Sequence, residues 1–338
     1  MSAIEATRQC LAAIPGLRVN EDEPLAQHTR FGIGGPARLF AESAAREPFL
    51  EALRIVFDTG VPWTLIGGGT NLVVSDQGFD GVVLRYTGGA ISGEGPLVQV
   101  EAGAVLQDLV DQSIARGLSG LHTMTGIPGG VGGAIYGNAG AYGHSIQESV
   151  ARVWFFDGTA LRSLTNAQCE FRYRESIFKA EKNWIIIAAE LEMPCGDAAT
   201  LKAEADAILD LRNRKYPPEM KCAGSIFKNL LLRDLAPAVR EQIPSQVIRE
   251  GKVPSAWFLE QVGGKGMRDG DIHVADYHAN LIYNAGSGSA RQVRAMIAEL
   301  KKRVNQRFGI ELEEEVQYVG FTQASRQAGQ PVSLKTSV

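Results

Sequence analysis

Three consecutive glycines stand in the segment Ile66-Gly67-Gly68-Gly69-Thr70-Asn71-Leu72. Successive glycines permit positive φ angles and close backbone approach, so several N–H groups can point at one anion. We interpret the stretch as a loop that holds a diphosphate, with a simple tight turn between strands as the alternative. It is neither a P-loop, because no Gly-Lys-Ser/Thr follows, nor a Rossmann fingerprint, because its spacing and the following segment do not fit.

A second glycine-rich stretch occupies residues 126–143. It begins Gly126-Ile127-Pro128-Gly129-Gly130-Val131-Gly132-Gly133-Ala134 and ends Asn138-Ala139-Gly140-Ala141-Tyr142-Gly143. Such an uncharged path of small residues can lie flush against a flat cofactor, although small residues also pack helices against sheets. Two separate glycine tracts favour a long ligand that has both a diphosphate and a planar ring.

Periodicity predicts regular elements on both sides of the first tract. Pro48 suits a first helical position, and apolar residues recur at helical spacing until Gly60 ends the helix. Residues 62–66 and 71–74 are predicted strands that flank the glycines. A second helix is expected at residues 105–116, with Val105 on its apolar face.

The later part of the chain alternates in the same way. Strands are predicted at residues 153–156 and 184–187, and a helix at 198–213 that ends before Tyr216-Pro217-Pro218. A helix at 290–308 has a capping box of Ser289 and Gln292 and is closed by Gly309. A strand follows at 310–319, and alternation puts Glu311, Glu313 and Glu315 on one face. The helix charges Lys301, Lys302 and Arg303 are expected to be solvated.

Composition excludes several classes of protein. The 338 residues are 45% hydrophobic and carry a formal charge of −4, which gives no positive field for nucleic acid or an anionic membrane surface. No secretion signal is visible, and the strongest apolar run, residues 184–189, is far shorter than the roughly 20 residues of a membrane span. The four cysteines show no metal spacing, and we expect reduced thiols in a cytoplasm.

Three polar residues are candidates for chemistry, each with a plainer alternative. Arg174 could orient a carboxylate or phosphate, or form a surface salt bridge. Ser225 lacks a G-x-S-x-G frame, so a turn serine is the alternative. Glu315 could be an ordinary solvated carboxylate. The five histidines have no ligand spacing, so neither a metal site nor a catalytic triad is supported.

The order of seven blocks closely resembles the UDP-N-acetylenolpyruvoylglucosamine reductase family over residues 20–320. The blocks are Thr29-Arg30-Phe31-Gly32-Ile33-Gly34-Gly35, Gly67-Gly68-Gly69-Thr70-Asn71, Gly126-Ile127-Pro128-Gly129, Asn138-Ala139-Gly140-Ala141-Tyr142, Tyr173-Arg174-x-Ser176, Gly224-Ser225-x-Phe227-Lys228-Asn229 and Leu312-Glu313-x-Glu315-Val316. The resemblance implies an FAD enzyme that uses NADPH to reduce a UDP sugar enolpyruvyl ether to UDP-N-acetylmuramate. The pathway implied is bacterial peptidoglycan synthesis, and with it cell wall biogenesis, cell shape, cell cycle and cell division.

The resemblance also implies an architecture. The fold would be α+β, with a two-part FAD-binding region of the vanillyl-alcohol-oxidase type and a smaller α+β substrate domain. We expect the two FAD subdomains at residues 1–86 and 87–197 and the substrate domain at 198–309. Strand 310–320 would return to the active site, and residues 321–338 would form a flexible tail. No obligatory protein partner is evident.

Residue roles follow from the same resemblance. The FAD diphosphate would be held by Ile66, Gly67, Gly68, Gly69, Thr70 and Asn71, and the flavin and adenosine parts by Gly126, Ile127, Pro128, Gly132, Gly133, Asn138, Gly140, Ala141 and Tyr142. The substrate would contact Tyr173, Lys215, Lys228, Asn229 and His278, and Asn280 is left without a role.

The resemblance assigns the chemistry to the three polar candidates. Hydride from flavin N5 would place negative charge on the substrate carboxylate, where Arg174 and a protonated Glu315 would donate hydrogen bonds. Ser225 would give the proton to the adjacent carbon, assisted by Lys228 or a water.

Two departures and two alternatives accompany the resemblance. The stretch between Arg174 and Ser225 lacks the tyrosine-bearing loop of one subtype, and Leu230 stands where a proline is common. An FAD-dependent oxidase or dehydrogenase acting on a small alcohol or hydroxy acid is one alternative, and a non-catalytic flavin or nucleotide-sugar binding protein is the other. NADPH-over-NADH preference and oligomeric state are not determined by the sequence.

Overall fold

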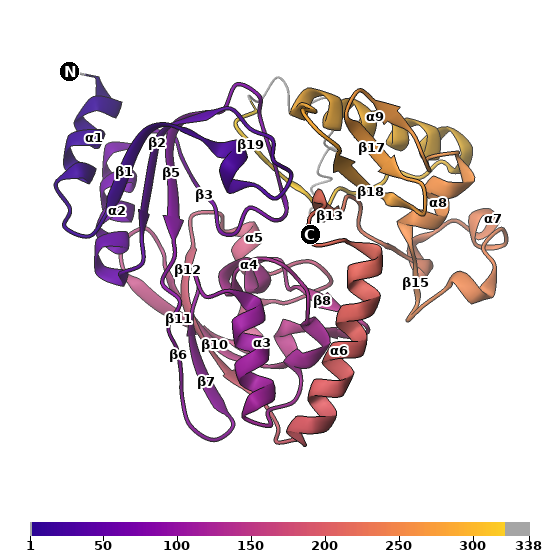
Figure 1. Cartoon of the computed structure of the whole chain (residues 1–338), viewed down its shortest axis with the longest axis horizontal. Helices are drawn as coiled ribbons and strands as arrows, with labels where there is room; N and C mark the ends of the chain where they lie inside the picture. The colour runs from indigo at the N-terminus through magenta and orange to yellow at the C-terminus, as the bar shows by residue number, and fades with distance from the viewer. Residues whose placement is uncertain (1, 322–338) are drawn as a thin grey trace, which may run out of the picture. The chain divides into compact units, whose positions relative to one another are not determined.

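The computed structural model describes residues 2–321 and divides into two compact units (Figure 1). Unit 1 comprises Met1–Glu23, Ala37–Thr70 and Asp80–Met220. Unit 2 comprises Pro24–Pro36, Asn71–Phe79 and the described residues from 221 to 321. The tail expected at 321–338 lies outside the described residues, apart from Phe321.

The first sheet of unit 1 has the strand order β1-β2-β5-β3, and β3 pairs with β5 in parallel. Its elements are α1 (Ala3–Ala12), β1 (Arg18–Pro24), β2 (Pro36–Ser43), α2 (Arg46–Thr59), β3 (Trp63–Leu65) and β5 (Phe79–Tyr86). Helix α2 ends at Gly60, whose φ of 64° is the left-handed cap that the sequence predicts. Apolar residues of α1 and α2, among them Leu11 and Leu53, are fully buried against Leu39 and Leu84 of the sheet.

The second sheet of unit 1 is antiparallel, in the order β11-β10-β12-β7-β6. This part of unit 1 also contains helices and a separate β8–β9 pair. In chain order its elements are β6 (Ile91–Ser92), β7 (Leu97–Glu101), α3 (Leu106–Ala115), α4 (Val131–Tyr136), β8 (Gly140–Ala141), β9 (His144–Ser145), β10 (Val150–Phe156), β11 (Leu161–Thr165), α5 (Ile177–Ala180), β12 (Ile185–Glu192) and α6 (Ala198–Lys215). Side chains of β7, β10 and β12 share one core with α3 and α4. That core includes Val131, Ala134 and Ile135 of the second glycine tract.

Unit 2 is built on an antiparallel sheet in the order β13-β18-β17-β16, with parallel β19-β4 and antiparallel β14-β15 pairs beside it. Its elements are β4 (Leu72–Val74), β13 (Lys221–Ser225), β14 (Leu230–Leu231), α7 (Pro237–Arg240), β15 (Lys252–Val253), α8 (Ser255–Gln261), β16 (Arg268–Asp269), β17 (Ile272–Ala275), β18 (His278–Asn284), α9 (Ala290–Phe308) and β19 (Gln317–Val319). Helix α9 has the predicted capping box and the predicted left-handed Gly309. Its buried stripe packs with β17 and β18 in one core.

The chain divides differently from the expected scheme. Helix α6 belongs to unit 1, and the units change at Met220 instead of near residue 197. The reason is packing, because Leu201 and Ala205 of α6 lie in the same core as α3 and β12. Two short segments, Pro24–Pro36 and Asn71–Phe79, also leave the surrounding chain to join unit 2.

Four local expectations need correction. Val105 is the N-cap of α3 and is 51% exposed, so the apolar face begins at Leu106. A helix, α4, interrupts the glycine path expected between residues 126 and 143. The strand expected at 310–319 is regular only at β19. Lys301 is buried, not solvated, and pairs with Glu311 and Glu314.

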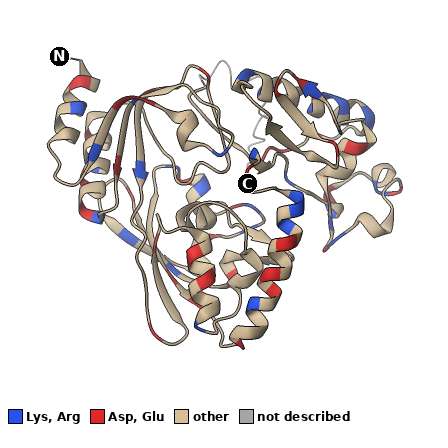
Figure 2. Ribbon diagram, viewed as in Figure 1, with Lys and Arg blue, Asp and Glu red and all other residues tan. Residues whose placement is uncertain are grey.

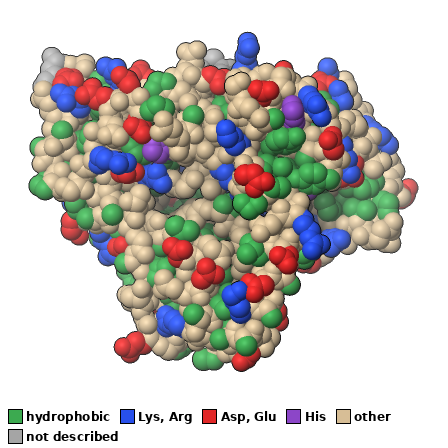
Figure 3. All heavy atoms as spheres, viewed as in Figure 1, with side chains coloured by type: hydrophobic (Ala, Val, Ile, Leu, Met, Phe, Trp, Pro, Cys, Tyr) green, Lys and Arg blue, Asp and Glu red, His purple; other side chains and the backbone are tan. Residues whose placement is uncertain are grey.

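The described residues carry charges of both signs on their surface. In Figure 2 acidic residues lie along the middle of α6 and basic residues at its C-terminal end, and both signs are interspersed over the face shown in Figure 3. Within residues 2–321 no helix is both long and apolar enough to span a bilayer. Nor do these residues contain a His, Cys, Asp and Glu cluster that could hold a metal ion.

Candidate functional site

The first glycine tract continues directly from β3. The Ile66 N–H donates to the Leu84 carbonyl at 3.0 Å and so extends the pairing of β3 with β5 before the chain turns away. Gly69 has a φ of 62°, a left-handed conformation that glycine adopts without steric cost. The tract therefore leaves the sheet as a loop anchored at its first residue.

The two tracts lie against each other within unit 1. A Cβ on Gly68 would come within 3.0 Å of the Gly129 Cα, and one on Gly129 within 2.9 Å of Thr70 Oγ1. The Thr70 hydroxyl donates to the Pro128 carbonyl at 3.3 Å. The structure thus brings together two segments that are about 60 residues apart, as a single ligand with a diphosphate and a ring requires.

Within the second tract, neighbouring glycines have different surroundings. A Cβ on Gly132 would lie 2.9 Å from the Ala102 Cβ, and the Gly132 N–H donates to the Ala102 carbonyl at 2.8 Å. Gly132 therefore packs α4 onto the sheet. Gly133 is exposed, and no described atom lies within 4 Å of the position its Cβ would take.

These surroundings fit an FAD. Gly67, like Gly133, has open space where a side chain would stand. The Thr125 hydroxyl, directly before the tract, is in a residue only 3% exposed, and no described residue hydrogen-bonds to it. A bound cofactor could approach the backbone at the two open glycines. It could also accept a hydrogen bond from the buried Thr125 hydroxyl, which has no partner among the described residues.

Asn138 has a structural use that the sequence does not reveal. Its φ is 42°, and its amide donates to the Arg172 carbonyl at 2.8 Å and to Gln147 at 3.2 Å. It therefore joins the glycine tract to the loop that carries Arg174. Its contact with FAD stays a prediction, as do those of Gly140, Ala141 and the exposed Tyr142.

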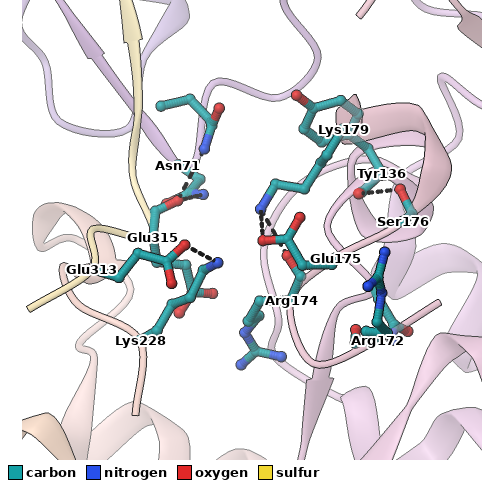
Figure 4. A network of polar contacts seen from close by, with 12 residues as sticks. Asn71, Tyr136, Arg172, Arg174, Glu175, Ser176, Lys179, Lys228, Glu313 and Glu315 are labelled. Atoms are coloured by element: carbon teal, nitrogen blue, oxygen red, sulfur yellow. Dashed lines mark hydrogen bonds and ion pairs between the residues drawn. The ribbon is translucent and has the colours of Figure 1, made fainter. Parts of the chain in front are cut away.

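Arg174 sits in a tight turn with a φ of 58°, a left-handed conformation that is uncommon in non-glycine residues. Its guanidinium donates to the Gly140 carbonyl at 3.0 Å and lies over the Tyr173 ring, 5.4 Å from its centroid. Lys179 donates to the Arg174 carbonyl at 2.7 Å and also pairs with Glu175, as Figure 4 shows. The Arg174 backbone is thus fixed from its own loop.

The same loop is fixed to α4. The Ser176 hydroxyl donates to the Tyr136 carbonyl at 2.7 Å (Figure 4). Burial raises the pKa of the Tyr136 phenol, and the nearby Glu175 carboxylate adds to that shift. Tyr136 therefore stays neutral beside a carboxylate at ordinary pH.

In unit 2, Ser225 ends β13 directly after Gly224, whose φ is 73°. The buried Lys228 pairs with Glu313. Asn229 accepts a hydrogen bond from the Ser255 N–H at 3.3 Å, at the start of α8. Ser225, Lys228 and Asn229 thus occupy one short segment that is tied into the unit.

Glu315 lies on the neighbouring segment of unit 2. Its N–H donates to the Ile226 carbonyl at 2.7 Å, and its own carbonyl accepts from the Asn71 amide at 2.9 Å (Figure 4). The structure therefore brings together three predicted site residues from distant parts of the sequence, namely Asn71, Ser225 and Glu315.

The remaining substrate candidates are placed as follows. Lys215 is the exposed last residue of α6 in unit 1, with its ammonium 5.0 Å from the Tyr216 ring centroid. His278 is the first residue of β18 in unit 2, and its Nδ1 accepts the Asn280 N–H at 3.2 Å. Their contacts with substrate stay predictions.

Comparison with known proteins agrees with this arrangement. Residues 38–160 match the family model described as FAD binding domain, and residues 216–319 match UDP-N-acetylenolpyruvoylglucosamine reductase, C-terminal domain. The chain is 60% identical over 310 residues to the UDP-N-acetylenolpyruvoylglucosamine reductase of Solibacter usitatus, covering 92% of this chain and 99% of the relative. It is 33% identical to that of Bacillus subtilis, covering 90% and 94%.

A solved structure gives the same result. The UDP-N-acetylenolpyruvylglucosamine reductase of Thermus caldophilus superposes with a TM-score of 0.69 at 27% identity, covering 90% of this chain and 98% of that one. The α+β fold with an FAD-binding domain is therefore confirmed, and the protein is a flavin-dependent oxidoreductase that binds FAD. More specifically, the chain belongs to the UDP-N-acetylenolpyruvoylglucosamine reductase family.

Sequence reasoning missed several residues that build the site. Asn280 and Lys179 act through backbone groups, and Thr125 is a single hydroxyl beside a glycine tract. No spacing rule connects a strand amide to a backbone segment more than 50 residues earlier. Only Asn280 is named beforehand, from its place in the resemblance and without a role.

Proposed function

We propose that this enzyme uses NADPH to reduce UDP-N-acetylglucosamine enolpyruvate to UDP-N-acetylmuramate, in peptidoglycan precursor synthesis. The observation that carries the proposal is the 60% identity, over nearly the full length of both chains, to a relative named for that reaction. Arg174, Ser225 and Glu315 are the residues to which the resemblance assigns the chemistry.

FAD, when bound, supplies hydride-transfer chemistry, with the electrons entering from NADPH and leaving to the enol-ether carbon. The FAD would be held by backbone groups of the glycines at 67, 68, 129 and 133. The buried hydroxyl of Thr125 would form a hydrogen bond to the FAD. The open positions at Gly67 and Gly133 support this assignment. Backbone N–H groups can neutralise diphosphate charge without bringing a counter-charge into the site.

The polar residues have separate tasks. Hydride addition places negative charge on the substrate carboxylate, and Arg174 would donate hydrogen bonds to that charge from a backbone already fixed by Lys179. Glu315 in its protonated form would donate to the same group. Ser225 would release its hydroxyl proton to the neighbouring carbon, which completes addition across the double bond, and would recover a proton from solvent.

The substrate's diphosphate would be bound by cationic and amide groups. Lys215 provides an exposed point charge, Asn229 an amide, and Tyr173 a ring that lines the nucleotide pocket. Lys228, which is buried and paired with Glu313, lies three residues after Ser225 in the same segment and would assist it. His278 would contact the same substrate.

The test separates the two half-reactions in stopped-flow absorbance. Ser225→Ala should leave the reduction of the flavin by NADPH within about twofold of wild type. Reoxidation by the UDP sugar should fall by roughly 10²-fold or more, the scale of a lost general acid. Ser113→Ala, at a buried serine of α3 whose hydroxyl donates to the Leu109 carbonyl, is the matched control. Equal loss of both half-reactions in Ser225→Ala would contradict the assignment.

A further inference from the structure

The segment that carries Ser225 departs from regular sheet pairing. Cys222 pairs with Tyr283 and Ser225 with Leu281, so two residues on β13, Ala223 and Gly224, stand opposite one on β18, Ile282. Gly224, with its φ of 73°, lies in this irregularity. A bulge redirects the residue that follows it, but it leaves the chain with fewer ladder hydrogen bonds to hold the new direction.

Asn280 provides the missing hydrogen bonds. Its Oδ1 accepts from the Phe227 N–H and its Nδ2 donates to the Phe227 carbonyl, both at 2.9 Å. Its own carbonyl accepts from the Ile226 N–H at 3.1 Å. One residue thus binds both residues that follow Ser225, and it does so from inside the core, because Asn280 is 2% and Phe227 1% exposed.

The opposite edge of this segment holds Glu315. The Ile226 carbonyl accepts the Glu315 N–H at 2.7 Å, and the Lys228 N–H donates to the Glu313 carbonyl at 2.9 Å. The segment is therefore clamped between Asn280 on one side and the Glu313–Glu315 backbone on the other. A shift of the Phe227 backbone would therefore displace Ser225, two residues earlier, and would also disturb Glu315, which is hydrogen-bonded to Ile226.

The amide side chain of Asn280 is suited to holding the Phe227 backbone in place. Its neighbours on β18, Ala279, Leu281 and Ile282, are fully buried and apolar. A polar amide in such a strand is costly unless every hydrogen-bonding group is satisfied, and here both ends of the amide are used on one backbone residue. An apolar residue of similar volume would fill the space but would leave the Phe227 N–H and carbonyl without these bonds.

We propose that Asn280 is a positioning residue for proton transfer, setting the placement of Ser225 relative to Glu315 through the backbone of Phe227. The inference rests on the proposed function, since it takes Ser225 as the proton donor. It assigns Asn280 no contact with substrate or FAD.

The experiment measures both half-reactions of the FAD-loaded enzyme under anaerobic conditions, in H₂O and in D₂O. Asn280→Leu should slow reoxidation by UDP-N-acetylglucosamine enolpyruvate by about tenfold or more, with a larger solvent isotope effect. Reduction by NADPH should stay within about twofold. Asn280→Asp, which keeps an acceptor for the Phe227 N–H, should fall between wild type and Asn280→Leu. If Asn280→Leu does not fold, Asn280→Asp decides alone.

Asn284→Leu is the matched control, because Asn284 is a buried amide on the same strand that bonds Phe31, Gly286 and Gly288 instead. It should lower thermal stability without separating the two half-reactions. Equal slowing of both half-reactions in the Asn280 variants, unchanged reoxidation, or failure of both variants to fold while the control folds would overturn the inference.

Ser225→Ala distinguishes this failure from that of the proposed function. Slow reoxidation in Ser225→Ala with normal reoxidation in the Asn280 variants refutes only the role of Asn280. Normal reoxidation in Ser225→Ala refutes Ser225 as proton donor, and the positioning role falls with it.

Discussion

The side-chain amide of Asn71 donates a hydrogen bond to the backbone carbonyl of Glu315, 2.9 Å away and 244 residues further along the chain. The Asn71 carbonyl in turn accepts the Gln317 N–H at 2.9 Å, and β4 then pairs in parallel with β19. The residue that follows the first glycine tract therefore anchors the segment that carries Glu315.

Asn71→Ala removes this anchor. We expect the free energy of unfolding to fall by about 1 kcal/mol, the usual value of one hydrogen bond, and reoxidation by the UDP sugar to slow by about tenfold. Chemical denaturation and stopped-flow absorbance check the two effects. Asn20→Ala, whose amide bonds only the nearby Glu23 side chain, is the control. A variant that loses FAD affinity alone would show that Asn71 serves the cofactor and not Glu315.

Two adjacent glycines should respond differently to alanine. Gly132→Ala places a Cβ 2.9 Å from that of Ala102 and should destabilise the apoprotein by roughly 1–3 kcal/mol. Gly133→Ala meets no described atom within 4 Å, so it should stabilise the apoprotein by up to about 1 kcal/mol, as alanine does in a helix. It should nevertheless weaken FAD binding by about tenfold. Thermal melting of the apoprotein and FAD titration measure both. Unchanged FAD affinity in Gly133→Ala would mean that the cofactor does not use this opening.

Arg174→Lys keeps the charge but loses the planar fork and the contact over Tyr173. Because stabilisation of developing charge depends on placed donors, we expect reoxidation by the UDP sugar to fall by about 10²-fold, with a smaller effect on flavin reduction. Arg172→Lys is the neighbouring control, since the Arg172 side chain is 76% exposed. Equal effects of the two substitutions on reoxidation would rule out a specific role for Arg174.

The cluster of Lys301, Glu314 and Tyr318 makes stability sensitive to high pH. Burial raises the pKa of the Tyr318 phenol, and the Glu314 carboxylate, to which it is hydrogen-bonded, raises it further. For Lys301, burial works against the charge, but hydrogen bonding to Glu311 and the charge of Glu314 outweigh it and raise the pKa. Both groups therefore keep a proton in the folded protein at pH values where the unfolded chain has lost it.

These raised pKa values make the folded protein less stable at high pH. Stability from these two groups is complete below about pH 10, where both states are protonated, and is lost as pH rises through the folded pKa values. Tyr318→Phe should flatten the decline above pH 10 by less than about 1.4 kcal/mol per pH unit, the limit for one proton. Melting temperatures between pH 8 and 11 provide the measurement. An unchanged slope in Tyr318→Phe would show that Tyr318 does not contribute.

The sequence predicts best where local signals and tertiary packing agree. Helix α9 begins and ends where its capping box and Gly309 indicate, because an apolar stripe, a cap and a left-handed glycine all act locally. Helix α4 is predicted only as the alternative for its tract, because Gly132 and Gly133 disfavour a helix locally and the core contacts of Val131 and Ile135 that stabilise it are tertiary. Lys301 was misjudged because its carboxylate partners come from beyond the helix.

The residues of the candidate site likewise differ in how far the sequence predicts them. The glycine tracts and the three polar residues could be named from their motifs, because each motif is contiguous. Asn280 and the anchoring use of Asn71 could not, since a hydrogen bond to a distant backbone group leaves no pattern in sequence. The cytoplasmic location, the missing tyrosine loop and the individual contacts with FAD and substrate stay predictions.

The most direct test of the central claim is the visible absorbance of the purified protein under anaerobic conditions. A flavin spectrum should bleach on addition of NADPH and return on addition of UDP-N-acetylglucosamine enolpyruvate, with about one equivalent of UDP-N-acetylmuramate formed per flavin. Bleached flavin that returns only when oxygen is admitted would contradict the account and favour an oxidase.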